Sequence, residues 1–205
     1  MKPLLYILGL FIVALSCTEE PYQCNCDITD VPKNDSIFSS DEFNENLKKF
    51  STRYNQTPLS ELADESYRLS TKHAFNKYYQ VFTLTKTKKG GDFLVQEYLC
   101  SKPYANDGKL NYERRSTLSM SEWDSFKTVI EHNCFWTLSL EDPDSSEYFD
   151  GGEWYIEGFQ PNKRNCSKSD YICTSRKMPS TSDRFYNVYT SLMNMVNKNE
   201  IHATE

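Results

Sequence analysis

Residues 78–100 read YYQVFTLTKTKKGGDFLVQEYLC, and this stretch decides the fold. Two runs rich in β-branched and aromatic residues, 78–86 and 93–100, flank the tetrapeptide Lys89-Gly90-Gly91-Asp92. Residues of this kind favour strands, and a glycine-containing turn between two strands is typical of a β-hairpin. The stretch therefore predicts an antiparallel strand pair that turns at the two glycines.

Similar patterns on either side extend the sheet and add helices. Alternating apolar residues predict strands, while capping residues followed by apolar residues at helical spacing predict helices. The further strands are predicted at 67–75, 110–116, 153–159 and 171–176. Three helices are predicted, at about 40–54, from Ser119 to Asn133, and at about 181–197. Ser119 and Glu122 cap the second of these helices, and Ser180 caps the third. This order indicates an α+β domain: a mostly antiparallel sheet of about five or six strands with two to three packed helices.

The first residues resemble an export signal. Met1–Ser16 carries one positive charge, Lys2, and an apolar run that is too short to span a bilayer, which is the layout of a signal peptide. Two cleavage patterns fit its end: an ordinary site after Ser16, and a sequence that resembles the lipobox of bacterial lipoproteins, with Cys17 as the lipidated first residue. We expect a signal peptide over 1–16, a lipid-anchored tether over 17–38 and one domain over 39–200.

The number of cysteines favours the lipoprotein interpretation. An odd total of seven would leave an unpaired thiol in an exported protein, whereas lipidation of Cys17 leaves six. These six are disulfide candidates: Cys24, Cys26, Cys100, Cys134, Cys166 and Cys173. Among the fifteen possible pairings, Cys100 with Cys134 and Cys166 with Cys173 are the ones that the predicted elements favour. We expect the protein in the cell envelope, facing the periplasm or the cell surface.

The charge of the chain narrows the classes of partner. The formal net charge is -6, and the predicted mature chain carries -7 because the leader contains Lys2 and no acidic residue. Nucleic-acid phosphates require a basic surface, so no nucleic-acid partner is expected. The same charge argues against electrostatic docking to anionic lipid, which leaves the anchor as the expected contact with the membrane.

Several motifs, in order, resemble a family of small, functionally uncharacterised bacterial proteins. They are Tyr67-Arg68-Leu69, Leu118-Ser-x-x-Glu122-Trp123, Phe135-Trp136-Thr137-Leu138, Asp150-Gly151-Gly152-x-Trp154-x-x-Glu157-Gly158 and the segment from Tyr171 to Pro179. The resemblance spans about residues 66–196. Lys177-Met178 stands where that family has Trp-Ser, 161–170 is an insertion, and the cysteines are additional. The resemblance implies an α+β architecture and no reaction.

Five residues of the second half are candidates for a binding site: Asp150, Glu153, Trp154, Glu157 and Arg176. Clustered carboxylates can bind Ca²⁺ or serve as an acid/base pair, but an acidic, solvated loop explains the same pattern. Glu157 and Arg176 are expected to face each other across paired strands, joined by Arg68. A structural ion pair is the simpler interpretation of these charges.

No catalytic motif appears, so we expect no catalytic residue, metal or cofactor. The chain contains neither a Gly-x-Ser-x-Gly elbow nor a His-Glu-x-x-His motif, and its seven glycines form no phosphate loop. The sequence therefore predicts a non-catalytic protein-binding module, and an immunity protein against an envelope-targeting toxin is a specific version. A hydrolase that uses Asp150, Glu153 and Glu157 is the alternative.

Overall fold

The structure is a computed structural model of the chain. It describes residues 56–72, 75–103, 105, 107–138, 152–161, 171–177, 179 and 181–201. The signal peptide, the tether and the helix predicted at 40–54 lie outside these residues. The expectations for those segments therefore stay predictions.

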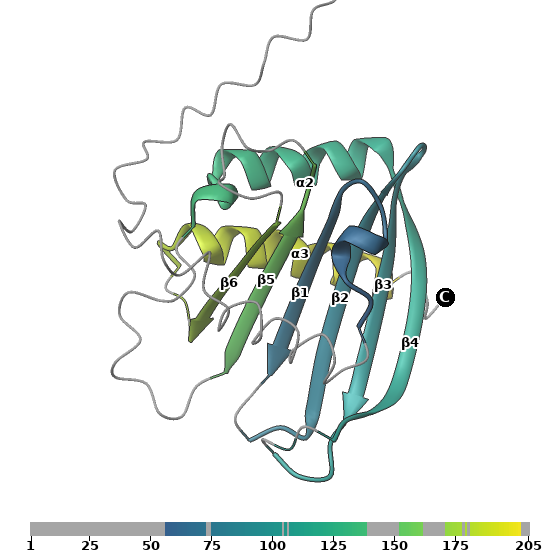
Figure 1. Cartoon of the computed structure of the whole chain (residues 1–205), viewed down its shortest axis with the longest axis vertical. Helices are drawn as coiled ribbons and strands as arrows, with labels where there is room; N and C mark the ends of the chain where they lie inside the picture. Colours follow the sequence, from purple (N-terminus) through teal and green to yellow (C-terminus); the bar gives the residue numbers. More distant parts are fainter. Residues whose placement is uncertain are drawn as a thin grey trace, which may run out of the picture.

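Six antiparallel strands form one open sheet in the order β4-β3-β2-β1-β5-β6 (Figure 1). The strands are β1 (Ser66–Lys72), β2 (Tyr78–Thr87), β3 (Gly90–Leu99), β4 (Lys109–Ser119), β5 (Glu153–Phe159) and β6 (Tyr171–Lys177). Two helices, α2 (Met120–His132) and α3 (Arg184–Ile201), pack against the sheet, and in Figure 1 α3 lies behind its middle. The predicted α+β class is confirmed.

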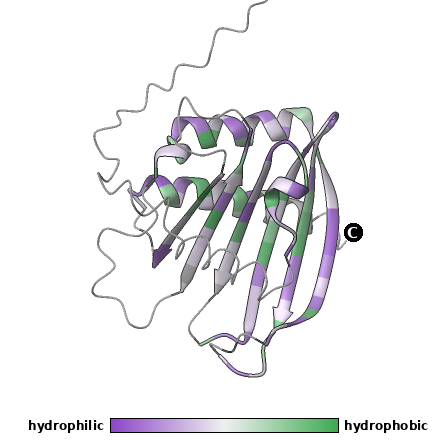
Figure 2. Ribbon diagram, in the orientation of Figure 1, coloured by the Kyte–Doolittle hydropathy of each residue, from purple (hydrophilic) through white to green (hydrophobic). Residues whose placement is uncertain are grey.

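Alternation along the strands places the core between the sheet and the two helices. Tyr67, Phe82, Phe93 and Ile156 point to the helix side and are almost completely buried. Figure 2 shows apolar residues concentrated on the central strands, while the edge strand β4 is largely hydrophilic. The opposite face of the sheet is more polar and carries the short 3-10 helix η2 (Leu59–Glu61). The helix side of the sheet therefore holds the main core, and the opposite face does not.

Helix α2 begins where its capping signal predicts. Ser119 accepts a hydrogen bond from the backbone N–H of Glu122, and the Glu122 carboxylate accepts one from the Ser119 N–H at 2.9 Å. Trp123 then packs flat against the sheet over Gly91, where a Cβ atom would lie 2.6 Å from the indole ring. The capping box and this close approach fix the position of the helix over β3.

Three predicted boundaries differ from the observed ones. Gly90 and Gly91 belong to β3 and not to the turn; Gly90 has a φ of 140°, and a Cβ atom there would lie 2.1 Å from the carbonyl oxygen of Leu118. Strand β4 is longer at both ends than predicted. Helix α3 begins at Arg184, and its first turn is capped by Asp183, whose carboxylate accepts the N–H of Phe185 at 2.8 Å.

Candidate functional site

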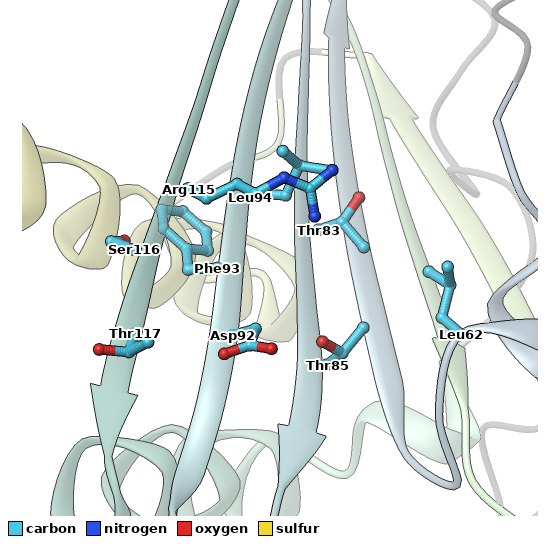
Figure 3. Close-up of a pocket in the computed structure, with 9 residues that line it drawn as sticks. All are labelled: Leu62, Thr83, Thr85, Asp92, Phe93, Leu94, Arg115, Ser116 and Thr117. Atoms are coloured by element: carbon cyan, nitrogen blue, oxygen red, sulfur yellow. The ribbon is translucent and has the colours of Figure 1, made fainter.

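A groove of about 430 Å³ lies on the sheet face that the helices leave uncovered (Figure 3). Cross-strand neighbours form its floor in two rows, because β2, β3 and β4 are in register there. The side chains that define this threonine groove are Leu62, Thr83, Thr85, Asp92, Leu94, Arg115 and Thr117, with Phe93 and Ser116 also lining it. Three strands and the segment after η2 therefore contribute to one site.

The threonine groove carries one charge of each sign. In the first row, the Asp92 carboxylate lies between Thr85 and Thr117, and among the described residues no side chain pairs with it. In the second row, the Arg115 guanidinium lies across Leu94 (Figure 3). Arg115 also contacts Glu113 at 3.3 Å, but its side chain is 74 % exposed, so this ion pair is weak.

Two leucines give the groove an apolar part beside these two exposed charges. Leu94 lies beneath the Arg115 side chain, and Leu62 stands beside the groove from the segment that follows η2. The arrangement can hold an extended segment that offers a basic group to Asp92 and an apolar group to Leu62. Among the described residues that line it, Asp92 is the one carboxylate.

A buried ion pair adjoins the groove. The Arg68 guanidinium lies 3.4 Å from the Glu157 carboxylate, donates to the carbonyl of Thr57 at 2.6 Å, and is 3.5 Å from the Thr83 hydroxyl. The Tyr171 hydroxyl donates to the other Glu157 oxygen at 2.7 Å. Arg68 and Glu157 are both almost fully buried, so this network braces the floor of the groove from the side.

The electrostatics of this network keep its neighbours neutral. Burial first, and the Glu157 carboxylate second, raise the pKa of Tyr171 well above its ordinary value. The same two causes raise the pKa of the Cys173 thiol, which is the cross-strand neighbour of Glu157. A thiol held protonated is a poor nucleophile, so Cys173 is unsuited to catalysis.

The expected ion pair between Glu157 and Arg176 is wrong. Glu157 is opposite Cys173 and Arg176 is opposite Trp154, so the two charges point to opposite faces of the sheet. The partner of Glu157 is Arg68. Arg176 instead donates to the Asp183 carboxylate at 3.1 Å on the helix side.

The other predicted binding residues do not gather into one site in the described part of the chain. Trp154 stacks on Tyr189 with ring centroids 4.0 Å apart, on the helix side. Glu153 begins β5, opposite Lys72 and Lys177. Outside the described residues lie Asp150, the lipidation candidate Cys17, and the disulfide candidates Cys24, Cys26 and Cys166.

Both favoured disulfide pairings are wrong. Cys100 and Cys173 are reduced thiols, so Cys100 does not bond to Cys134 and Cys173 does not bond to Cys166. Cys134 is disulfide-bonded. Cys134 also has a left-handed backbone with φ of 48° between α2 and η3 (Phe135–Thr137).

Sequence reasoning missed the threonine groove. Thr83, Thr85 and Thr87 alternate with core residues, and that spacing signals a solvent-facing side of a strand. Among the described residues no group of three or more His, Cys, Asp or Glu side chains is placed to hold a metal ion. No helix in the same part of the chain is long and apolar enough to cross a membrane.

Comparison with known proteins assigns no relatives. No protein-family model matches the chain, and no curated protein matches it. The resemblance to small uncharacterised bacterial proteins therefore stays a prediction. The proposed function therefore rests on the geometry of the groove.

Proposed function

We propose that this chain is a lipid-anchored, non-catalytic protein-binding module of the cell envelope, and that the threonine groove receives its partner. The observation that carries the proposal is the pairing of an unpartnered Asp92 carboxylate with an exposed Arg115 and an apolar wall at Leu62. Interfaces combine an apolar anchor with a rim of complementary charges in this way.

The charge of the chain indicates which partner fits best. A protein with a net charge of -6 attracts a basic partner over a distance and so speeds the encounter. A lysine or arginine side chain of that partner would meet Asp92, and its methylene stem or an apolar neighbour would cover Leu62. An immunity protein that captures a basic toxin at the envelope is the specific version of this role.

The anchor is the second part of the proposal. Several acyl chains on Cys17 would hold the protein at the membrane, since each buried methylene contributes about 0.8 kcal/mol. Cys17→Ala is expected to move the protein from the membrane fraction to the soluble fraction of the envelope. A Cys17→Ala chain that stays in the membrane fraction after a salt wash would refute the anchor.

Site-specific photo-crosslinking in living cells tests the groove. A benzophenone amino acid replaces Thr117, which is exposed in the groove, and in a matched control it replaces Thr128, which is exposed on the outer side of α2. We expect one protein adduct from position 117 and none of that mass from position 128. No adduct at 117, or the same adduct at both positions, would contradict the proposal.

The hydrolase alternative has no supporting geometry in the described residues. It requires two carboxylates in one concave site, whereas Glu157 is buried in an ion pair and Asp92 stands without a second acid in the groove. A binding role, in contrast, does not require a second carboxylate in the groove.

A further inference from the structure

One end of the sheet carries exposed apolar side chains. At this end the chain passes from β1 to β2 and from β3 to β4 (Figure 1). The apolar tip consists of Phe75, which is 77 % exposed, together with the exposed side chains of Tyr78, Leu99 and Leu110. Tyr78 is opposite Leu99 on one face of the sheet, whereas Leu110 is opposite Tyr98 on the other face, so the apolar tip covers both faces of this end.

Lysines surround the apolar tip. Lys109 is opposite Leu99, and the carbonyl of Lys77 accepts the N–H of the residue after Leu99 at 2.8 Å. Lys102 is exposed in the connection between β3 and β4. In that connection the one described acid is Asp107, which is exposed and accepts the N–H of Ser101 at 3.1 Å. The described side chains of the two turns thus carry three positive charges and one negative.

We propose that the apolar tip rests on the surface of an anionic lipid bilayer, with Phe75 inserted among the lipids. The proposal rests on the envelope location proposed above and is independent of the groove. Lysine side chains reach phosphate head groups while a phenylalanine and leucines enter the acyl boundary, which is the composition of membrane-surface segments. The net charge of the whole chain argues against such a contact, but the local lysines outweigh it at the tip, because charges beyond about 8 Å are screened at physiological salt.

The composition of the apolar tip favours lipid over a protein partner. Protein interfaces are depleted in lysine and enriched in arginine, whereas the tip has three lysines and no arginine among its described residues, and its aromatic side chains suit either kind of partner. No ion pair joins Lys77 or Lys109 to an acid among the described residues, so these two lysines are available to lipid phosphates, while Lys102 has Asp107 as a charged neighbour. The attraction between lysine side chains and lipid phosphates does not require a shaped cavity.

This orientation would also present the groove to a partner. Asp92 is seven residues along β3 from Leu99, and strands rise about 3.3 Å per residue, so the groove lies about 23 Å from the tip. A protein approaching along the membrane would therefore find the groove clear of the lipid surface.

Depth-dependent quenching tests the proposal with the full anchored chain in vesicles. Phe75→Trp places a fluorophore at the tip, and Lys89→Trp places one in the turn between β2 and β3 at the opposite end of the sheet. With brominated lipids and one third phosphatidylglycerol, we expect quenching and a blue shift for Phe75→Trp. Lys89→Trp is expected to show neither, beyond the background of the native tryptophans.

Removing the lysines separates the electrostatic contribution. Each lysine contributes about fivefold to binding of an anionic surface, so Lys77→Gln, Lys102→Gln and Lys109→Gln together are expected to reduce the inserted population about 100-fold. These side chains are exposed, and unchanged near-ultraviolet circular dichroism would confirm the fold. In vesicles of phosphatidylcholine alone, the inserted population of Phe75→Trp is expected to fall as much as it does on substitution of the three lysines.

Two outcomes would overturn the proposal. One is that Phe75→Trp is quenched no more than Lys89→Trp in either vesicle. The other is that Phe75→Trp becomes shielded only when envelope proteins are added, which would make the tip a protein contact. Asp92→Lys, which alters the groove, is expected to leave the quenching of Phe75→Trp unchanged. Failure of the membrane proposal can therefore be told apart from failure of the proposed partner-binding role of the groove.

Discussion

The buried pair of Arg68 and Glu157 makes a sharp prediction about stability. Glu157→Leu would leave the Arg68 guanidinium, which is 1 % exposed, without its counter-charge, and would remove the acceptor of the Tyr171 hydroxyl. Breaking a buried pair from one side costs about 3–5 kcal/mol, because the remaining charge is no longer compensated. Small domains are stable by only about 5–15 kcal/mol, so urea unfolding followed by tryptophan fluorescence should detect the loss easily.

Two companion variants separate charge from shape. Glu157→Gln keeps an acceptor for Tyr171 but removes the charge, and we expect it to lose about 1.5–3 kcal/mol. Arg68→Met combined with Glu157→Leu removes both charges, and we expect it to be more stable than Glu157→Leu alone. If Glu157→Leu costs less than about 1 kcal/mol, or if the losses of Glu157→Leu and of Arg68→Met measured alone add up to the loss of the double variant, the pair does not brace the sheet as described.

Three further predictions concern packing, thiols and pH. Gly91→Ala should lose about 1–3 kcal/mol in urea unfolding, because the added Cβ lies 2.6 Å from the Trp123 ring; an unchanged midpoint would contradict the close approach. Cys100 and Cys173 should be alkylated by iodoacetamide only after unfolding, as mapped by mass spectrometry, and rapid labelling of the native chain would refute the burial of Cys100 and the raised pKa of the half-buried Cys173. The raised pKa of Tyr171 means that the folded state keeps a proton that the unfolded chain releases, so the free energy of unfolding should fall as pH rises above about 10; a Tyr171→Phe chain should show a shallower fall, and an equal slope would refute the assignment.

The fold was predictable where local chemistry decides it. Ser119 and Glu122 form the expected capping box, and strand alternation alone placed β2 and β3. The turn between these strands was not predictable, because the two glycines serve tertiary needs: Gly91 makes room for the indole of Trp123, which arrives from a distant part of the chain. A glycine in a turn and a glycine beneath a ring look the same in sequence.

The candidate site was largely hidden from the sequence. Whether Glu157 meets Arg176 depends on the register of β5 against β6, and one residue of slip moves a side chain to the other face. The groove depends in the same way on the registers that bring Asp92 beside Thr117.

Affinity for the partner recovered by crosslinking tests the central claim most directly. Asp92→Lys reverses the charge in the groove, and Asp124→Lys makes the same change on the exposed side of α2. We predict that Asp92→Lys weakens binding at least about tenfold, equivalent to 1.4 kcal/mol, while Asp124→Lys leaves the dissociation constant within about twofold. Equal losses for the two variants, or full binding by Asp92→Lys, would contradict a binding role for the threonine groove.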